Sequence, residues 1–163
     1  MRDVAARAEV ALGTLYRHYS SKDQLLLAAL GEQAETLRDR LQSRPPRGAT
    51  AADRVSDALR RACRALEREP RVIAAMMTAM WAPDAATAAM KRDVDTTLRA
   101  IITSAIADGG GDNVDDIVRV LGAVWFTALS HWVNGMSTAV QMANDLERAA
   151  HLVLREADAT PLR

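Results

Sequence analysis

The stretch that decides the fold, residues 4–26, reads VAARAEVALGTLYRHYSSKDQLL. Its apolar residues recur at helical spacing with an interruption in the middle, which predicts two short helices, over about 2–8 and 11–18, joined by a tight turn. Ser21 and Gln24 have capping-box spacing in front of an apolar run, so a longer helix should begin there and end before Pro45. The small core expected between these helices consists of Val4, Ala5, Ala8, Val10, Leu15 and Tyr19.

The second of these short helices has one side that the small core leaves exposed. A short helix held by a neighbour is the device with which a helix-turn-helix enters the major groove of DNA. Thr14 and His18 are placed for base edges or phosphates, and Tyr16 offers an apolar face to thymine methyls. Lys22 is placed for a phosphate at the start of the next helix. In the plainer interpretation Tyr16 is a core aromatic and Arg17 and Lys22 are solvated charges, but the motif as a whole favours DNA contact.

The runs GTLYRHY at 13–19 and SKDQLL at 21–26 resemble the signature of the tetracycline-repressor (TetR) family. The resemblance implies an all-α fold, with a helix-turn-helix DNA-binding module followed by a helical effector-binding and dimerisation domain. It also implies a homodimer that represses transcription from operator DNA and leaves the DNA when a small molecule binds. Carried over position by position, it implies DNA contacts from Arg2, Thr14, Tyr16, Arg17, His18 and Lys22.

Family members carry a helix before the position of Arg2, whereas this sequence starts at Met1. The resemblance thus implies that the first helix is missing, and an artificial start and a natural one both stay open. Without that helix the apolar faces of the small core lose a cover. This 163-residue form is therefore expected to bind DNA weakly or not at all, and a longer parent to bind well.

Breaks in the remaining sequence divide it into further helices. The Pro-Pro pair within Ser43–Gly48 marks a linker between a DNA-binding region with its connecting helix, at 1–42, and an effector-binding and dimerisation domain at 49–158. Thr50 and Asp53 repeat the capping-box spacing. The three glycines at Gly109–Gly111 should end the long helix that is expected from Asp84. Five helices, making eight in all, are expected to start near Thr50, Val72, Asp84, Asn113 and Ser137 or Thr138.

Apolar residues dominate the last two of these helices. The helix expected over 113–133 is apolar almost all round and needs partners on several sides, while the last helix is amphipathic and rich in small residues. Two such helices from each subunit suit an isologous four-helix interface. A homodimer through the last two helices is therefore expected, as the family resemblance also implies.

Methionine and aromatic residues gather around the break at Pro83 and in the helix over 113–133. They suit either ordinary core filling or an adaptable pocket, and both interpretations stay open. Because ionisable residues are rare there, a pocket would take a bulky hydrophobic molecule such as a lipid, a steroid or the acyl part of a thioester. The segments MTAMW at 77–81 and WFTALSHW at 125–132 resemble the KstR-like branch of steroid-catabolism repressors. The predicted ligand-binding residues are Met76, Met80, Trp81, Met90, Ile102, Trp125, Phe126 and Leu129.

Charge and reactive residues argue against other classes of protein. Basic and acidic residues balance at 21 each, so affinity for DNA must come from a local surface. The single cysteine, Cys63, allows no internal disulfide and is interpreted as a small core residue. The three histidines share no catalytic or metal-binding spacing, and His131 is interpreted as an interior residue. We expect no enzyme, no cofactor, no metal and no membrane partner, and a cytoplasmic location.

An alternative function stays open, that of a helical hydrophobic-ligand-binding or dimerisation protein with a vestigial DNA-binding module. It predicts ligand binding without sequence-selective affinity for DNA. A helical hydrolase is less favoured, because no nucleophile and base can be paired in the sequence.

Overall fold

The computed structural model describes residues 1–107 and 113–157, and this part of the chain contains helices and no strands. The all-α prediction is confirmed. A 3-10 turn replaces the first turn of the helix expected from Asp84, and the predicted closure at Gly109–Gly111 lies outside the described residues. The elements are α1 (Arg2–Arg7), α2 (Leu12–His18), α3 (Lys22–Ser43), α4 (Ala51–Leu66), α5 (Pro70–Trp81), η1 (Ala85–Thr87), α6 (Ala88–Ile106), α7 (Val114–Val133) and α8 (Ala139–Ala157).

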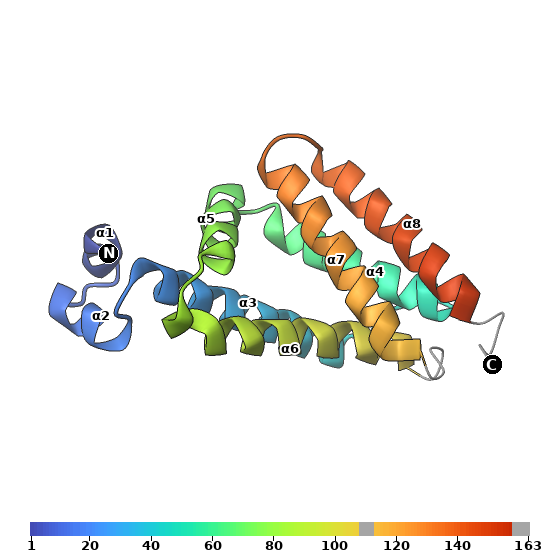
Figure 1. The fold of residues 1–163 in the computed structure, drawn as a ribbon, viewed down its shortest axis with the longest axis horizontal. Helices are drawn as coiled ribbons and strands as arrows, with labels where there is room; N and C mark the ends of the chain where they lie inside the picture. The colour runs from blue at the N-terminus through green and yellow to red at the C-terminus, as the bar shows by residue number, and fades with distance from the viewer. Residues whose placement is uncertain (108–112, 158–163) are drawn as a thin grey trace.

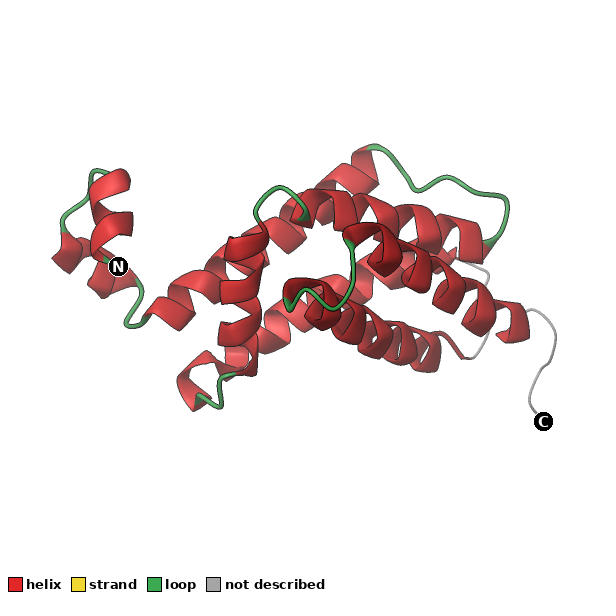
Figure 2. Cartoon of the chain, turned by 90° about the horizontal axis from the view of Figure 1, so that it is seen from above, coloured by secondary structure: helices red, strands yellow, loops and turns green. Residues whose placement is uncertain are grey.

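The molecule is elongated, with α1 and α2 at one end (Figure 1). From this end α3 runs along α6, and α5 stands across the two (Figure 1). At the other end α8 packs on both α4 and α7. Figure 2 shows α1 and α2 standing apart from the other helices, joined to them by the loop before α3. The long helix α3 is therefore the connection between the two parts.

The main hydrophobic core lies among α4, α6, α7 and α8. Each contributes a side chain with no exposed surface, namely Val55, Ile106, Leu121 and Leu146. Cys63 is buried in the same core, as predicted, and this burial raises the pKa of its thiol to about 11. Such a thiol stays protonated at neutral pH, which makes Cys63 a packing residue.

Side-chain caps fix the starts of three long helices, α3, α4 and α8, where the sequence predicts them. The Ser21 hydroxyl accepts a hydrogen bond from the backbone N–H of Gln24 at 3.1 Å. Thr50 and Asp53 form a full capping box, since each backbone N–H donates to the other side chain at 3.1 Å. Thr138, of the two predicted candidates, accepts from the N–H of Gln141 at 3.1 Å. By contrast, Asn113 begins α7 without a side-chain cap, and acidic residues in the first turn favour the helix dipole instead.

Replacing Thr50 with alanine is expected to lower the free energy of unfolding by about 1 kcal/mol, because the N–H of Asp53 loses its acceptor at the start of α4. Thr50→Ser is the matched control, since it keeps the hydroxyl and should stay close to the parent. Urea denaturation followed by circular dichroism measures both, and equal midpoints for Thr50→Ala and Thr50→Ser would contradict the prediction.

The capping box of Thr50 and Asp53 also makes the loss of stability in Thr50→Ala depend on pH. The hydrogen bonds from Thr50, its side chain first and its backbone second, hold the pKa of Asp53 below the ordinary value of 3.8. A carboxyl whose pKa is lowered by folding adds stability above its unfolded pKa and loses it as the pH falls through the folded pKa. The stability difference between the parent and Thr50→Ala should therefore narrow as the pH falls below 3.8.

Candidate functional site

A tight turn sets α2 against α1 at the free end of the molecule. Glu9 adopts a φ of 53°, in the left-handed region that non-glycine residues seldom occupy. The N–H of Val10 then donates to the carbonyl of Ala5 at 3.0 Å and closes the end of α1. Ala5 on α1 and Leu15 on α2 are both buried. These contacts give the two short helices the arrangement of a helix-turn-helix.

The small core predicted for this unit is only partly correct. Ala5 and Leu15 are buried and Tyr19 is half-buried, but Val4 and Val10 are 42% and 41% exposed. Ala8 is exposed as well. The reason is geometric, because α1 has six residues and only one of its faces is covered. Val4 is next to Ala5 in sequence and so points about 100° away from it around the helix, and Ala8 follows the last residue of α1.

The predicted DNA-contact residues lie at the surface of this unit. Leu12, Leu15 and Tyr19 form the inward face of α2, at three- and four-residue spacing. Thr14 and Arg17 lie on the opposite arc and Tyr16 lies at its edge, beside Leu12; Tyr16 is 48% exposed and Thr14 is half-buried. The list is completed by three exposed residues at the starts or ends of helices: Arg2 on α1, His18 on α2 and Lys22 on α3.

The eight predicted ligand-binding residues differ widely in burial. Three belong to the main core, and two pack against it from α7. The rings of Trp81 and Phe126 meet edge to face, with centroids 4.4 Å apart, and this contact ties the end of α5 to the middle of α7. In detail, Met76, Ile102 and Leu129 are buried, Met80, Met90, Trp125 and Phe126 are half-buried, and Trp81 is 65% exposed.

A shallow hollow of about 380 Å³ lies along the outer surface of α7 and α8. His131 lines it and is exposed, so its interpretation as an interior histidine is wrong. The reason is that His131 follows Ala123 and Thr127 at four-residue spacing on the uncovered face of α7. The full lining is Ala123, Val124, Thr127, Ala128, His131 and Asp145, which includes none of the predicted ligand-binding residues.

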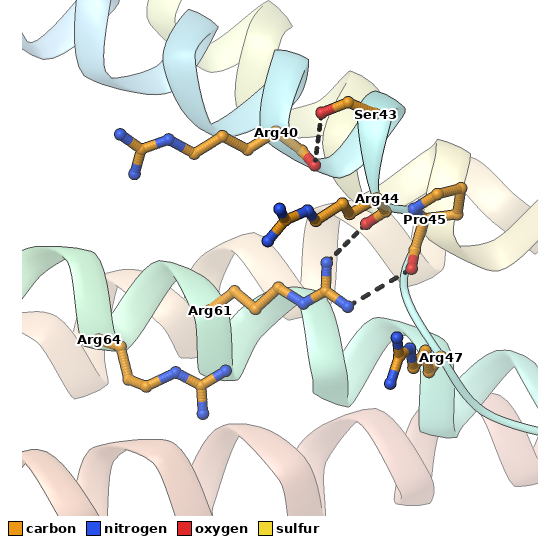
Figure 3. A pocket seen from close by; sticks show the side chains of 7 residues that line it. All are labelled: Arg40, Ser43, Arg44, Pro45, Arg47, Arg61 and Arg64. Carbon is orange, nitrogen blue, oxygen red and sulfur yellow. Dashed lines mark hydrogen bonds between the residues drawn. The ribbon is translucent and has the colours of Figure 1, made fainter.

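A second hollow, which sequence reasoning missed, lies between the end of α3 and the outer side of α4 (Figure 3). We call it the arginine hollow; its lining is Arg40, Ser43, Arg44, Pro45, Arg47, Arg61 and Arg64. The signal in the sequence is the density of arginine on both sides of the Pro-Pro pair and again at 60–64. That signal is weak, because arginine-rich surface helices are common.

The described residues offer neither a metal site nor a membrane-spanning helix. Over residues 1–107 and 113–157 no three histidine, cysteine, aspartate or glutamate side chains come together as a possible metal site. Over the same ranges, no helix has both the length and the apolar character that crossing a bilayer requires.

Both parts of the chain match known protein families. Residues 1–29 match the family described as bacterial regulatory proteins, tetR family. Residues 48–153 match the family described as tetracyclin repressor-like, C-terminal domain. The first match covers α1, α2 and the beginning of α3. The second covers the helices from α4 to most of α8.

Whole proteins give the same result. The HTH-type transcriptional repressor KstR of Rhodococcus jostii is 34% identical, over 99% of this chain and 76% of its own length. The protein of the same name in Mycobacterium tuberculosis is 32% identical, over 97% of this chain and 72% of its own length. A crystal structure of a TetR transcriptional regulator from Rhodococcus sp. RHA1 superposes with a TM-score of 0.81 at 28% identity. It covers 94% of this chain and 82% of that one.

Proposed function

Because the chain belongs to the tetR family of bacterial regulatory proteins, as a KstR-like transcriptional repressor, we propose that it binds operator DNA as a homodimer and leaves it when a bulky hydrophobic molecule binds. The observation that carries the proposal is the outward arc of α2 at the free end of the molecule. A bound duplex there meets Thr14, Tyr16 and Arg17 before any other part of the protein. A cytoplasmic location, where bacterial operator DNA lies, is part of this proposal.

Each predicted DNA-contact residue has a role that suits its chemistry. Tyr16 presents its ring to thymine methyls and its hydroxyl to a phosphate, and Thr14 presents its hydroxyl to a base edge. Arg17 and Lys22 bind phosphates, which positions the helix without reading sequence. His18 and Arg2 extend the contact along the backbone on either side of the groove. In this scheme residues 1–42 are the DNA-binding region with its connecting helix, and residues 49–158 are the effector-binding and dimerisation domain.

The effector is proposed to bind between α5 and α7, around the contact of Trp81 with Phe126. Trp81 is 65% exposed although it is a large apolar side chain, and the half-buried Met80 lies beside it in sequence. Met76, Ile102 and Leu129, which belong to the main core, are proposed to line the inner wall. A steroid, lipid or acyl chain inserted here separates Trp81 from Phe126.

A route from this region to the DNA passes through α6 and α3. The Thr97 hydroxyl on α6 donates to the Glu35 carboxylate on α3 at 2.7 Å. Gly31 of α3 lies close to Val94 of α6, where an added Cβ would be 3.9 Å from the valine methyl. A displacement of α6 therefore moves α3, and α3 carries the helix-turn-helix at its far end.

The homodimer is proposed to form through α7 and α8. Val120, Ala123 and Thr127 are exposed and follow one another along α7 at three- and four-residue spacing. On α8, Val140 and Leu152 are 69% and 60% exposed. Apolar side chains that are exposed along two packed helices mark a protein–protein surface. A two-fold axis at this surface pairs the same residues from both subunits and sets the two α2 helices about 34–36 Å apart on the DNA.

Thr127→Arg is expected to weaken the dimer at least tenfold, because a long charged side chain enters the centre of the interface from both subunits, where it holds the two surfaces apart and loses its water. Sedimentation equilibrium measures the change as a shift toward the monomer mass. Gln33→Arg, at an exposed position of α3, adds the same charge outside the proposed interface and should leave the mass unchanged. A Thr127→Arg protein with the dimer mass of the parent would contradict the proposed interface.

The whole proposal is tested by a gel mobility shift with DNA from upstream of the chain's own gene. Any shift by this 163-residue form is expected to be weak; it should be sequence-selective, weaken further as salt rises, and disappear when one member of a panel is added. The panel consists of a steroid, a long-chain fatty acid and an acyl thioester. Binding of a panel member without any sequence-selective shift favours the alternative, a hydrophobic-ligand-binding or dimerisation protein with a vestigial DNA-binding module.

A further inference from the structure

The arginine hollow is the larger of the two hollows described above, with a volume of about 810 Å³. It lies at the end of α3 remote from α2, where the chain leaves α3, passes Pro45 and returns along α4 (Figure 3). Its volume falls within the range of small-molecule sites. Neither the proposed DNA contacts nor the proposed effector residues line it.

One arginine holds the wall of the hollow together. Arg61 donates to the carbonyl of Arg44 at 2.6 Å and to that of Pro45 at 3.4 Å, which secures the loop after α3 (Figure 3). Its other partner is Asp57, at 2.6 Å. Asp57 also accepts the backbone N–H of Arg47 at 3.0 Å. Arg61 and the one carboxylate in its reach are thus committed to the fold.

Asp57 stays ionised in this setting. Its partial burial raises its pKa, but the hydrogen bond from the N–H of Arg47 and the charge of Arg61 outweigh that effect and leave the pKa below the ordinary value. The pair of Asp57 and Arg61 is therefore neutral as a unit at physiological pH. It offers no negative charge to the other arginines.

The other four arginines of the hollow are exposed, and none has a carboxylate within 4.0 Å among the side chains that the structure describes. They are Arg40, Arg44, Arg47 and Arg64. Four surface arginines outside the hollow have such partners, in the pairs Arg38–Glu35, Arg60–Glu147, Arg99–Asp95 and Arg119–Asp116, whereas others, such as Arg92 and Arg148, have none within the described part of the chain. What distinguishes the hollow is that four guanidinium groups without a carboxylate partner among the described residues line one concave surface.

The C-terminal ends of α3 and α4 compensate only part of the positive charge of the arginine hollow. Arg40 and Arg64 lie in the last turns of α3 and α4, where the helix dipole favours a cation. Two helix C-termini supply together about one negative charge, against four guanidinium groups. Most of the positive charge is thus left for a ligand.

We propose that the arginine hollow is a binding site for a small anion that carries several phosphate groups, as free polyphosphate or as a nucleotide. Guanidinium forks match phosphate oxygens in pairs, and four forks in one hollow suit several linked phosphates better than one carboxylate. Duplex DNA is not the occupant proposed, because α3 has 22 residues and so places the hollow about 33 Å from the helix-turn-helix. The site does not depend on the proposed DNA contacts.

The test is isothermal titration of the full chain with sodium tripolyphosphate at low ionic strength. We expect saturable binding, and at least a tenfold loss of affinity in the double variant Arg44→Gln/Arg64→Gln. The charge-matched control is Arg92→Gln/Arg99→Gln on α6, which removes two exposed arginines outside the hollow and should stay within twofold of the parent. Thermal melting of all three proteins with and without tripolyphosphate checks that the variants fold, and only the hollow variant should lose the ligand-induced rise in Tm.

Two further titrations identify the source of the phosphates. ATP that binds more tightly than tripolyphosphate assigns a nucleotide, and equal affinities assign free polyphosphate. Absence of saturable binding by the parent would overturn the proposal, as would equal losses in the two double variants. A random-sequence DNA duplex that binds more tightly than tripolyphosphate, and loses this affinity in Arg44→Gln/Arg64→Gln, would replace it with a nucleic-acid surface.

Discussion

Tyr16→Ala is expected to weaken binding to operator DNA roughly 5- to 150-fold, the loss that corresponds to one specific base contact of about 1–3 kcal/mol. Tyr16 is 48% exposed at one edge of the outward arc of α2, so the substitution removes little buried packing. The stability of the protein should change by less than about 0.5 kcal/mol, as for other surface substitutions. Fluorescence anisotropy with labelled operator measures the affinity.

Two further variants distinguish contact with bases from contact with phosphates. Tyr16→Phe keeps the ring and removes the hydroxyl, so it separates contact with thymine methyls from a hydrogen bond to phosphate. Lys22→Gln should weaken specific and random DNA alike and reduce the slope of log K against log salt by about 1. If Tyr16→Ala bound the operator as tightly as the parent, the outward arc of α2 would not be the reading surface.

Leu121→Ala is expected to lower the free energy of unfolding by about 2–5 kcal/mol, because it leaves a cavity that the surrounding helices fill only partly. Leu121 lies within α7 and has no exposed surface, and it belongs to the core that α4, α6, α7 and α8 share. A loss of this size is a large part of the total stability of a small domain. Chemical denaturation followed by circular dichroism measures it.

The control for this variant is Val4→Ala on α1. It also shortens an aliphatic side chain, but Val4 is already 42% exposed and should cost less than about 0.5 kcal/mol. Similar losses in both variants, or a loss in Leu121→Ala below about 1 kcal/mol, would mean that the core around α7 is looser than its burial indicates.

Local chemistry was sufficient to predict the helices and much of the candidate DNA interface. The hydroxyls of Ser21, Thr50 and Thr138 each cap the helix that the spacing of their neighbours predicted. The same holds for the proline break at the end of α3 and for the exposed side of α2. These features depend on residues within one or two turns of each other, and such short-range hydrogen bonds and periodicities can be read directly from a sequence.

Burial of single residues was harder to predict. Helical spacing identifies which residues share a face, but the partner helix decides whether that face is covered. Val4 and Val10 have the spacing of core residues and remain exposed, and His131 has apolar neighbours in sequence and still faces outward.

What the sequence by itself determined is the succession of helices, the caps of α3, α4 and α8, and the exposed side of α2. Only the tertiary structure decided which side chains meet across helices. Arg61 holds a carbonyl 17 residues away, Arg54 donates to the carbonyl of Ala105 51 residues away, and Trp81 packs on Phe126. Such contacts arise from the way the helices pack, and no local pattern records them. The arginine hollow is the clearest case, because its charges converge only after α3 and α4 have packed together.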